Sequence, residues 1–308
     1  MRRIAARDGG GAPGWVAALW LGAGCAAAPA PTRLWLAGDV HLGADGALGG
    51  PWAEAVRGPG FVNLEGPIGV GGAWAAPGQT RLGQHAGAPA ALRAAGVRFV
   101  GLANNHRDDA GAAGRAATAA ALAADGLVPV DRAWTGDGLH LVAAWAGEGA
   151  PAGLRAAVEA GPAGALRVVL LHVEGPAVYD PPAAAAPWVD AAVGAGARVV
   201  AVAGTHAVGP LEVRGGALVA WGLGDLAFDC DCSTGHEGLV LGVEAAGGAR
   251  GPLAVELWGL RPGRGARPPA PLGDPAALFA LLAGLGGAQP AARDGRFRLE
   301  VPAVDAAR

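Results

Sequence analysis

Polar side chains that can bind metal ions recur where apolar segments of this chain end. Four of its seven histidines lie within a few residues of such an end: His41, His106, His172 and His206. Asp39 precedes His41 by two residues, and residues i and i+2 of an extended backbone point to the same side. Ligand sites of open α/β sheets form at the carboxyl ends of strands. The pattern therefore predicts that these side chains converge at one edge of a sheet.

Amides and further carboxylates accompany the histidines, as in Asn63-Leu64-Glu65 and Asn104-Asn105-His106. Imidazole and oxygen ligands without thiolate suit Mn, Fe, Zn or Mg, and a carboxylate reachable from two sides can bridge two ions. Such ions would activate water and neutralise charge on a phosphoryl or acyl oxygen, and a spare imidazole could protonate the leaving group. We therefore predict a centre for one or two divalent ions.

Other polar residues have simpler interpretations. A single Asp or His after a strand is more often a cap or loop group than a ligand, and only the repetition at five strand ends favours a site. His140 lies inside an expected strand, whereas His85 and His236 lie in expected loops, so these three are predicted to be structural or exposed. Asp108 and Asp109 are predicted to cap a helix that begins at 110.

Bulk composition narrows the class of protein. The 308 residues are 52% hydrophobic and 16% charged, which is sufficient for a substantial core. The net charge of −3 argues against a nucleic-acid binder, because phosphate neutralisation needs clustered cations. The chain has no Gly-x-Ser-x-Gly elbow and no phosphate loop, which argues against a serine hydrolase and a nucleotide kinase.

Short apolar runs alternate with Ala-rich helical stretches, which predicts an α/β domain over 33–308 with a parallel or mixed sheet covered by helices. The expected strands are 33–37, 60–64, 97–102, 139–145, 166–171, 198–203, 217–221, 238–244 and 253–260. The expected helices are 88–95, 110–125, 152–160, 186–195 and 275–284.

Residues 1–32 have the character of a leader and tether. Three arginines among the first seven residues precede an apolar run over 15–24 that ends at Cys25. This run is too short to span a bilayer as a helix, and the arrangement is typical of a secretory signal. Leu21-Gly22-Ala23-Gly24-Cys25 resembles a lipoprotein signal, so we expect export and lipid anchoring to the cell envelope at Cys25. The alternative is an N-terminal extension with a chance cysteine.

The remaining pair, Cys230 and Cys232, is expected in a loop, either bonded or free.

Several motifs occur in a characteristic order. They are Gly38-Asp39-Val40-His41, Asn63-Leu64-Glu65-Gly66-Pro67, Leu102-Ala103-Asn104-Asn105-His106, His172-Val173-Glu174-Gly175 and Trp221-Gly222-Leu223-Gly224-Asp225. In this order they resemble the CapA family of bacterial capsule (poly-γ-glutamate) synthesis proteins, over about 33 to 285.

The resemblance implies a calcineurin-like metallophosphatase fold, a two-sheet sandwich flanked by helices. It also implies metal ligands at Asp39, Glu65, Asn105, His172 and His206, with His106 as the general acid. His41 completes an Asp-x-His pair found in true metallophosphatases, and we count it among the expected ligands.

Two departures from the family pattern bear on this centre. The family usually has His-Pro-His where this chain has Gly204-Thr205-His206, so one ligand of one ion is missing. The usual Leu-Gly-Asn is Leu-Gly-Asp at 223–225. We therefore expect the first metal position to be intact and the second to be weakened.

Three functions remain open from the sequence. The first is a capsule-synthesis protein with a metal-dependent hydrolase-type site, which would act on an anionic polymer or phosphoester beside membrane proteins of the capsule machinery. The second is a metal-dependent phosphoesterase unrelated to capsule. The third is a non-catalytic assembly scaffold with a degenerate site.

Overall fold

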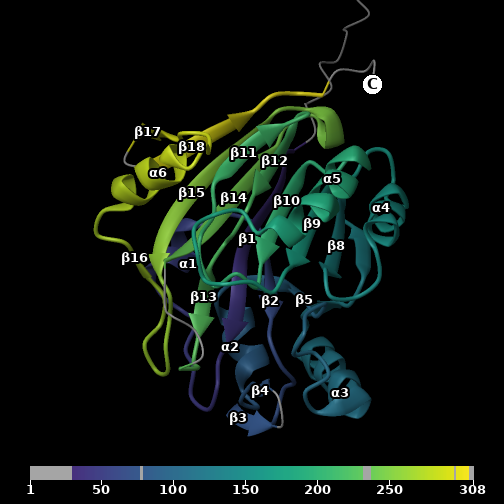
Figure 1. Ribbon diagram of the computed structural model, residues 1–308, viewed down its shortest axis with the longest axis vertical. Coiled ribbons are helices and arrows are strands. Elements are labelled where there is room, and N and C mark those ends of the chain that lie inside the picture. The colour runs from purple at the N-terminus through teal and green to yellow at the C-terminus, as the bar shows by residue number, and fades with distance from the viewer. Residues whose placement is uncertain (1–29, 77–78, 232–236, 295, 305–308) are drawn as a thin grey trace, which may run out of the picture.

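Two β-sheets packed face to face form the centre of the computed structural model, which describes residues 30–76, 79–231, 237–294 and 296–304. Figure 1 shows α4 and α5 against the strands β8, β9 and β10, whereas α6 packs on β15 and contributes to the core between the sheets. This arrangement confirms the predicted α/β sandwich. None of the helices within the described ranges is long and apolar enough to cross a membrane.

The larger sheet has the strand order β17-β18-β15-β14-β1-β2-β5-β6, with β13 also paired to β1 and β16 to β15. Its strands are β1 (Thr32–His41), β2 (Gly60–Leu64), β5 (Val97–Gly101), β6 (Val128–Val130), β13 (Asp225–Phe228), β14 (Gly238–Ala245), β15 (Leu253–Arg261), β16 (Ala270–Pro271), β17 (Ala291–Arg293) and β18 (Arg296–Val301). Strands β1, β2, β5 and β6 run parallel, and β13 is parallel to β1.

The smaller sheet has the order β11-β12-β10-β9-β8-β7. Its strands are β7 (Ala133–Gly136), β8 (Leu139–Trp145), β9 (Leu166–His172), β10 (Val199–Ala203), β11 (Leu211–Arg214) and β12 (Ala217–Ala220). Strands β8, β9 and β10 are parallel to one another. A separate hairpin is formed by β3 (Gly72–Ala76) and β4 (Gln79–Gly83).

The helices are α1 (Pro51–Ala55), α2 (Ala88–Ala94), α3 (Gly111–Ala124), α4 (Pro151–Glu159), α5 (Ala186–Gly194) and α6 (Pro275–Gly284), with 3₁₀ turns at Ala183–Ala185 and Gly248–Arg250. Helices α4 and α5 contact each other and strands β8 and β10 of the smaller sheet, whereas α2 and α3 contact β5 and β6 of the larger one. The five helices expected from the sequence are confirmed within a few residues.

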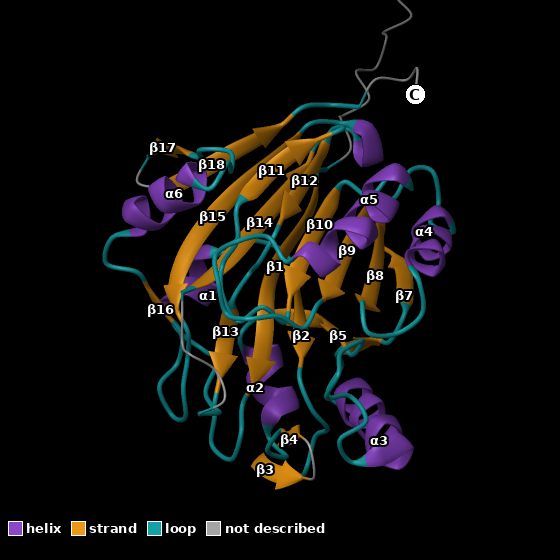
Figure 2. Ribbon diagram, viewed as in Figure 1, coloured by secondary structure: helices purple, strands orange, loops and turns teal. Residues whose placement is uncertain are grey.

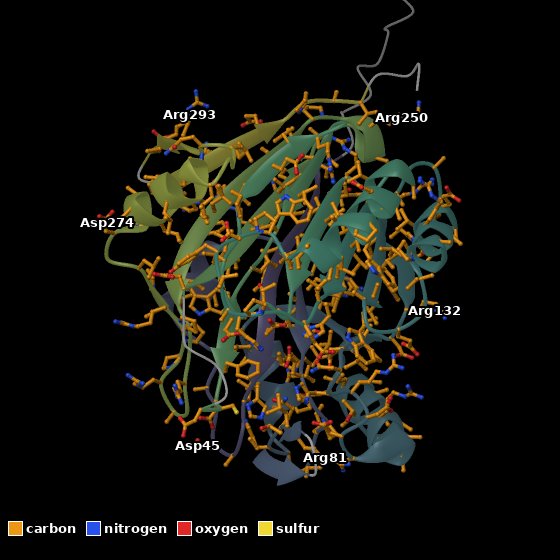
Figure 3. The ribbon with its side chains drawn as sticks, viewed as in Figure 1. Asp45, Arg81, Arg132, Arg250, Asp274 and Arg293 are labelled. Carbon is orange, nitrogen blue, oxygen red and sulfur yellow. The ribbon has the colours of Figure 1, made fainter. Side chains whose placement is uncertain are left out.

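Alternating side chains explain why the central strands are buried on two faces. Leu34 and Leu36 of β1 belong to the core between the sheets, whereas Trp35 and Ala37 face the cluster under the helices. Successive side chains of a strand point to opposite faces, so β1 contributes to two cores. The side chains drawn in Figure 3 fill the space between the sheets. Strands buried on both faces are expected for parallel sheets covered by helices.

The carboxyl ends of the parallel strands of both sheets lie on one side of the molecule. The arrowheads of β1, β2, β9 and β10 all point towards the lower part of Figure 2. Strand β1 contacts β10 across the sandwich, and β2 contacts β9. The loops that follow these strands therefore meet, and the predicted site residues lie in them.

Candidate metal centre

Asp39 lies near the end of β1, between two other polar strand residues. Its register partners are Asn63 on β2 and Asp225 on β13. Strand β13 can approach this closely because position 38 is glycine: a Cβ on Gly38 would lie 2.0 Å from the carbonyl oxygen of Gly224. The Asp39 side chain is completely buried, so the strand pairing alone brings a carboxylate into the interior.

Glu65 and His172 join Asp39 in a first group, whose ligand atoms all lie within 4.8 Å of one another. His172 Nδ1 is 3.5 Å from Glu65 Oε1 and 3.8 Å from Asp39 Oδ1. The other ring nitrogen, Nε2, donates to Asn105 Oδ1 at 2.9 Å. This hydrogen bond leaves the Nδ1 lone pair directed at the carboxylates.

Burial lowers the pKa of His172 to about 4, although the charge of Asp39 opposes the shift. The ring is therefore neutral near pH 7, which is the form of histidine that binds a metal ion. Ligating histidines commonly donate their second ring nitrogen to an oxygen acceptor. Asn105, which the family resemblance implied to be a ligand, lies at this position, with its Oδ1 2.9 Å from His172 Nε2.

His206 and Asp225 form a second group with Asp39, and its ligand atoms also lie within 4.8 Å of one another. His206 Nδ1 is 2.8 Å from Asp225 Oδ1 and 3.9 Å from Asp39 Oδ2. Burial lowers the pKa of His206, but the hydrogen bond and charge of Asp225, with the charges of Glu65 and Asp39, outweigh it and raise the pKa to about 10. Without a metal ion, this ring is an imidazolium near pH 7.

The centre holds more buried negative charge than its histidines can balance. Three carboxyl groups, those of Asp39, Glu65 and Asp225, are at most 1% exposed. Burial and the charge of Asp39 hold the pKa of Glu65 well above its usual range. Burying unbalanced charge is costly, and a divalent cation would remove this cost. The carboxylate and imidazole donors suit such a cation, so the residues fit the metal that the sequence pattern implies.

A model of the bacterial capsule synthesis protein family PGA_cap matches residues 56–133 and 134–230. The chain belongs to this family. No curated protein matches the chain. The resemblance to CapA proteins is thereby confirmed, and the sandwich described above is the metallophosphatase-like α/β fold of the PGA_cap family. The matched residues include Glu65, His172, His206 and Asp225, whereas Asp39 precedes them.

His106, the expected general acid of this PGA_cap protein, lies beside the two groups and is partly exposed. Its Nδ1 is 2.8 Å from Asp109 Oδ2, an oxygen that also accepts from the backbone nitrogen of Leu82 at 2.6 Å. Arg81, labelled near the bottom of Figure 3, donates Nη1 to the Asp109 carbonyl at 3.0 Å. Asp109 therefore fixes the imidazole, which leaves Nε2 for proton exchange.

The prediction that Asp108 and Asp109 cap a helix is wrong. Helix α3 has Ala110 at its N-cap and no side-chain cap hydrogen bond. The Asp108 carboxylate instead pairs with Arg107 and Arg115. The competing partners, two guanidinium groups for Asp108 and the His106 ring for Asp109, are not visible in a local sequence pattern.

The structure does not bring His41 into either group. Its Nε2 is 3.1 Å from the carbonyl oxygen of Gly83, and its ring packs 5.4 Å from that of Phe228. The register of β1 against β13 shifts between Asp39 and Val40. This irregularity breaks the alternation on which the Asp-x-His expectation rested, so Asp39 and His41 are directed to different surroundings.

His140, His85 and Cys230 are outside the centre. His140 is buried and bonds Thr135 Oγ1 and the carbonyl of Ala157, and His85 bonds the carbonyl of Gly46, so both have structural roles. Cys230 is buried and disulfide-bonded. His236, Cys232, Cys25 and most of the expected leader lie outside the described residues.

Two amides and one carboxylate of the centre were not assigned a role from the sequence. Asn63 Nδ2 donates to Asp39 Oδ1 at 2.8 Å and lies 3.3 Å from Glu65 Oε1 and 3.2 Å from His172 Nδ1. Asn104 holds this amide by donating to Asn63 Oδ1 at 3.1 Å. Asp225 begins strand β13, whereas the sequence pattern concerns residues at the ends of strands. The change from the usual Leu-Gly-Asn to Leu-Gly-Asp was the signal that pointed to it.

Proposed function

We propose that this capsule-synthesis protein contains a metal-dependent hydrolase centre that cleaves a phosphoester or amide bond while an anionic capsule polymer is made or exported. The observation that carries the proposal is the buried convergence of Asp39, Glu65 and His172, which supplies ligand atoms of the right chemistry and an excess of negative charge. Surface carboxylates occur on any protein, but Asp39, Glu65 and the neighbouring Asp225 are three buried carboxyl groups, and a cation would compensate for their charge.

In this centre Asp39, Glu65 and His172 would hold the ion. A divalent ion supplies a Lewis acid that polarises a phosphoryl or carbonyl oxygen. Asn105 keeps His172 in the tautomer that presents Nδ1, because its oxygen accepts from Nε2. Asn63 donates to Asp39 and so fixes the direction of that carboxylate.

His106 is the group that exchanges a proton with the leaving group. Its side chain is 16% exposed, which allows contact with a substrate, whereas the ligand side chains beneath it are almost fully buried. The Nδ1 contact with Asp109 fixes the ring orientation, as a positioned proton donor requires. A positioned acid of this kind contributes about 10²–10⁴-fold to a hydrolytic rate.

We further propose that the chain is exported, anchored through lipidated Cys25 and active in the cell envelope beside membrane proteins of the capsule machinery. The leader pattern of the sequence supports this location. A Cys25→Ala variant should move from the membrane fraction to the soluble fraction of the envelope. Unchanged membrane association of this variant would contradict lipid anchoring.

Capsule production in a deletion strain tests the hydrolase proposal. The strain is complemented with the wild type, Glu65→Gln, His106→Gln or the control Asp190→Asn, which alters an exposed carboxylate on α5 paired with Arg214. We expect wild type and Asp190→Asn to restore capsule, and Glu65→Gln and His106→Gln to fail at equal protein levels. Full restoration by both site variants would instead indicate a scaffold function.

A further inference from the structure

Asp39 presents its two carboxylate oxygens to two different sets of side chains. Oδ1 accepts from Asn63 and lies on the side of His172. Oδ2 accepts from the backbone nitrogen of Gly204 at 2.7 Å and lies on the side of His206. The proposed function uses only the first side. A carboxylate that faces two ligand groups has the arrangement needed to bridge two ions.

The backbone at His206 supports a binding role for the second side. His206 has φ 52°, a left-handed conformation that is uncommon for residues other than glycine. This conformation directs the ring towards Asp225 Oδ1, and the Phe228 ring packs against it at 4.7 Å. Such backbone strain persists where the surrounding structure fixes it, and it is concentrated at binding and catalytic sites.

Position 204 in the loop before His206 cannot carry a side-chain ligand, and the Thr205 hydroxyl donates to the carbonyl oxygen of Ala207. A Cβ on Gly204 would lie 2.6 Å from His172 Cε1 and 2.7 Å from the carbonyl oxygen of Val173. Any side chain there would displace His172, which belongs to the first group. A further ligand must therefore come from another element, and Asp225 at the start of β13 is the fully buried carboxylate that reaches His206.

We propose that Asp225 is a metal ligand of this protein and that it holds a second divalent cation together with His206 and Asp39, with Asp39 bridging the two ions. The inference rests on the proposed function, because the first ion is the one held by Asp39, Glu65 and His172. The sequence led us to expect a weakened second metal position. We instead infer that the Asp225 carboxylate from β13 compensates for the ligand that the 204–206 loop lacks.

Metal stoichiometry after reconstitution with Mn²⁺ tests the inference on the full chain. Bound manganese is counted by mass spectrometry, and electron paramagnetic resonance distinguishes a coupled manganese pair from an isolated ion. The variants are Asp225→Asn, which keeps an oxygen acceptor for His206, and His206→Gln. Glu65→Gln probes the first position. The matched control is Asp229→Asn, a carboxylate four residues along the same segment and outside both groups.

We expect two ions in the wild type and in Asp229→Asn, with a spectrum of a coupled pair. Asp225→Asn and His206→Gln should each retain one ion with an isolated-ion spectrum. Because supporting residues around a metal cost 10–100-fold in affinity when altered, loss of a ligand should weaken the second ion by at least about tenfold. His206→Gln keeps the test valid if Asp225→Asn fails to fold.

Two ions and a coupled spectrum in Asp225→Asn would overturn the inference. One ion in the wild type, retained in Asp225→Asn and lost in Glu65→Gln, would overturn it while leaving the proposed function intact. A wild type that binds no manganese, with an unaltered fold, would overturn both.

Discussion

The two ends of strand β10 bury polar groups in opposite ways. At its amino end, the nearly buried Arg198 donates to three carbonyl oxygens, from Nε to Gly216 at 2.7 Å, from Nη1 to Ala249 at 2.7 Å and from Nη2 to Pro302 at 3.1 Å. At its carboxyl end, His206 meets carboxylates whose charges exceed its own. Both regions belong to one sheet, but the first places one cation among backbone carbonyls, whereas the second gathers several carboxyl groups around one imidazole.

The difference distinguishes polar side chains that are buried to stabilise the fold from polar side chains that are buried to bind a ligand. Arg198 ties the turn after β11, the 3₁₀ turn at Gly248–Arg250 and the C-terminal segment to β10. A fully satisfied buried network of this kind stabilises a fold. Burying several carboxyl groups together is costly, and the proposed metal ion would offset this cost.

Removal of the Arg198 side chain should have the largest effect on stability. Arg198→Met removes the donor of three carbonyl oxygens, and each lost hydrogen bond costs about 1 kcal/mol. We expect the free energy of unfolding to fall by about 3 kcal/mol in urea titrations. Metal stoichiometry of the folded variant should be unchanged, and loss of metal would show that the two ends of β10 are not independent.

The metal-free protein should lose stability as the pH rises. The folded-state pKa of His206 is about 10, above the ordinary value of about 6.5. Its stabilising contribution is therefore complete below about pH 6.5 and is lost as the pH rises through 10. The raised pKa of Glu65 acts in the same direction.

Thermal unfolding of the metal-free chain between pH 6 and 10 measures this dependence. We expect a steady decline for the wild type and a shallower one for His206→Gln, which has no titrating ring. If the unfolding temperatures of the two proteins fell equally steeply with pH, the assignment of the charge to His206 would be contradicted.

The smallest effect is expected at His41. His41→Gln replaces a ring that contacts the Gly83 carbonyl, away from both ligand groups. We expect a change in unfolding free energy of about 1 kcal/mol and unchanged metal content by mass spectrometry. A loss of metal in this variant would mean that the Asp-x-His pattern describes the centre better than the structure does.

Regular alternation made most of the fold predictable. The middle of β1 (34–37) and of β9 (168–171) is a continuous apolar run because both faces are covered, and the Ala-rich stretches became helices. The short hairpin β3–β4 and the terminal strands β17 and β18 were not predicted. Their pairing depends on neighbours: β18, for example, alternates Arg296 and Arg298 with apolar residues and pairs with β15.

The candidate site was predictable only in part, for reasons of register. Asp39, Glu65, His172 and His206 converge as the strand-end pattern predicts. His41 does not, because an irregular register after Asp39 changes the direction of the following side chains. Asp225 was not predicted because it lies at the start of β13. It is adjacent to Asp39 only because β13 pairs with β1, which is distant in the sequence.

The most direct test of the account is the metal content of the purified full chain, wild type beside Asp39→Asn and the exposed control Asp190→Asn. Asp39 belongs to both ligand groups, so its replacement should affect every bound ion. We predict near-stoichiometric divalent metal in the wild type and in Asp190→Asn, and loss of all of it in Asp39→Asn. A wild type that stays metal-free after reconstitution, or an Asp39→Asn protein that keeps its metal, would contradict the account.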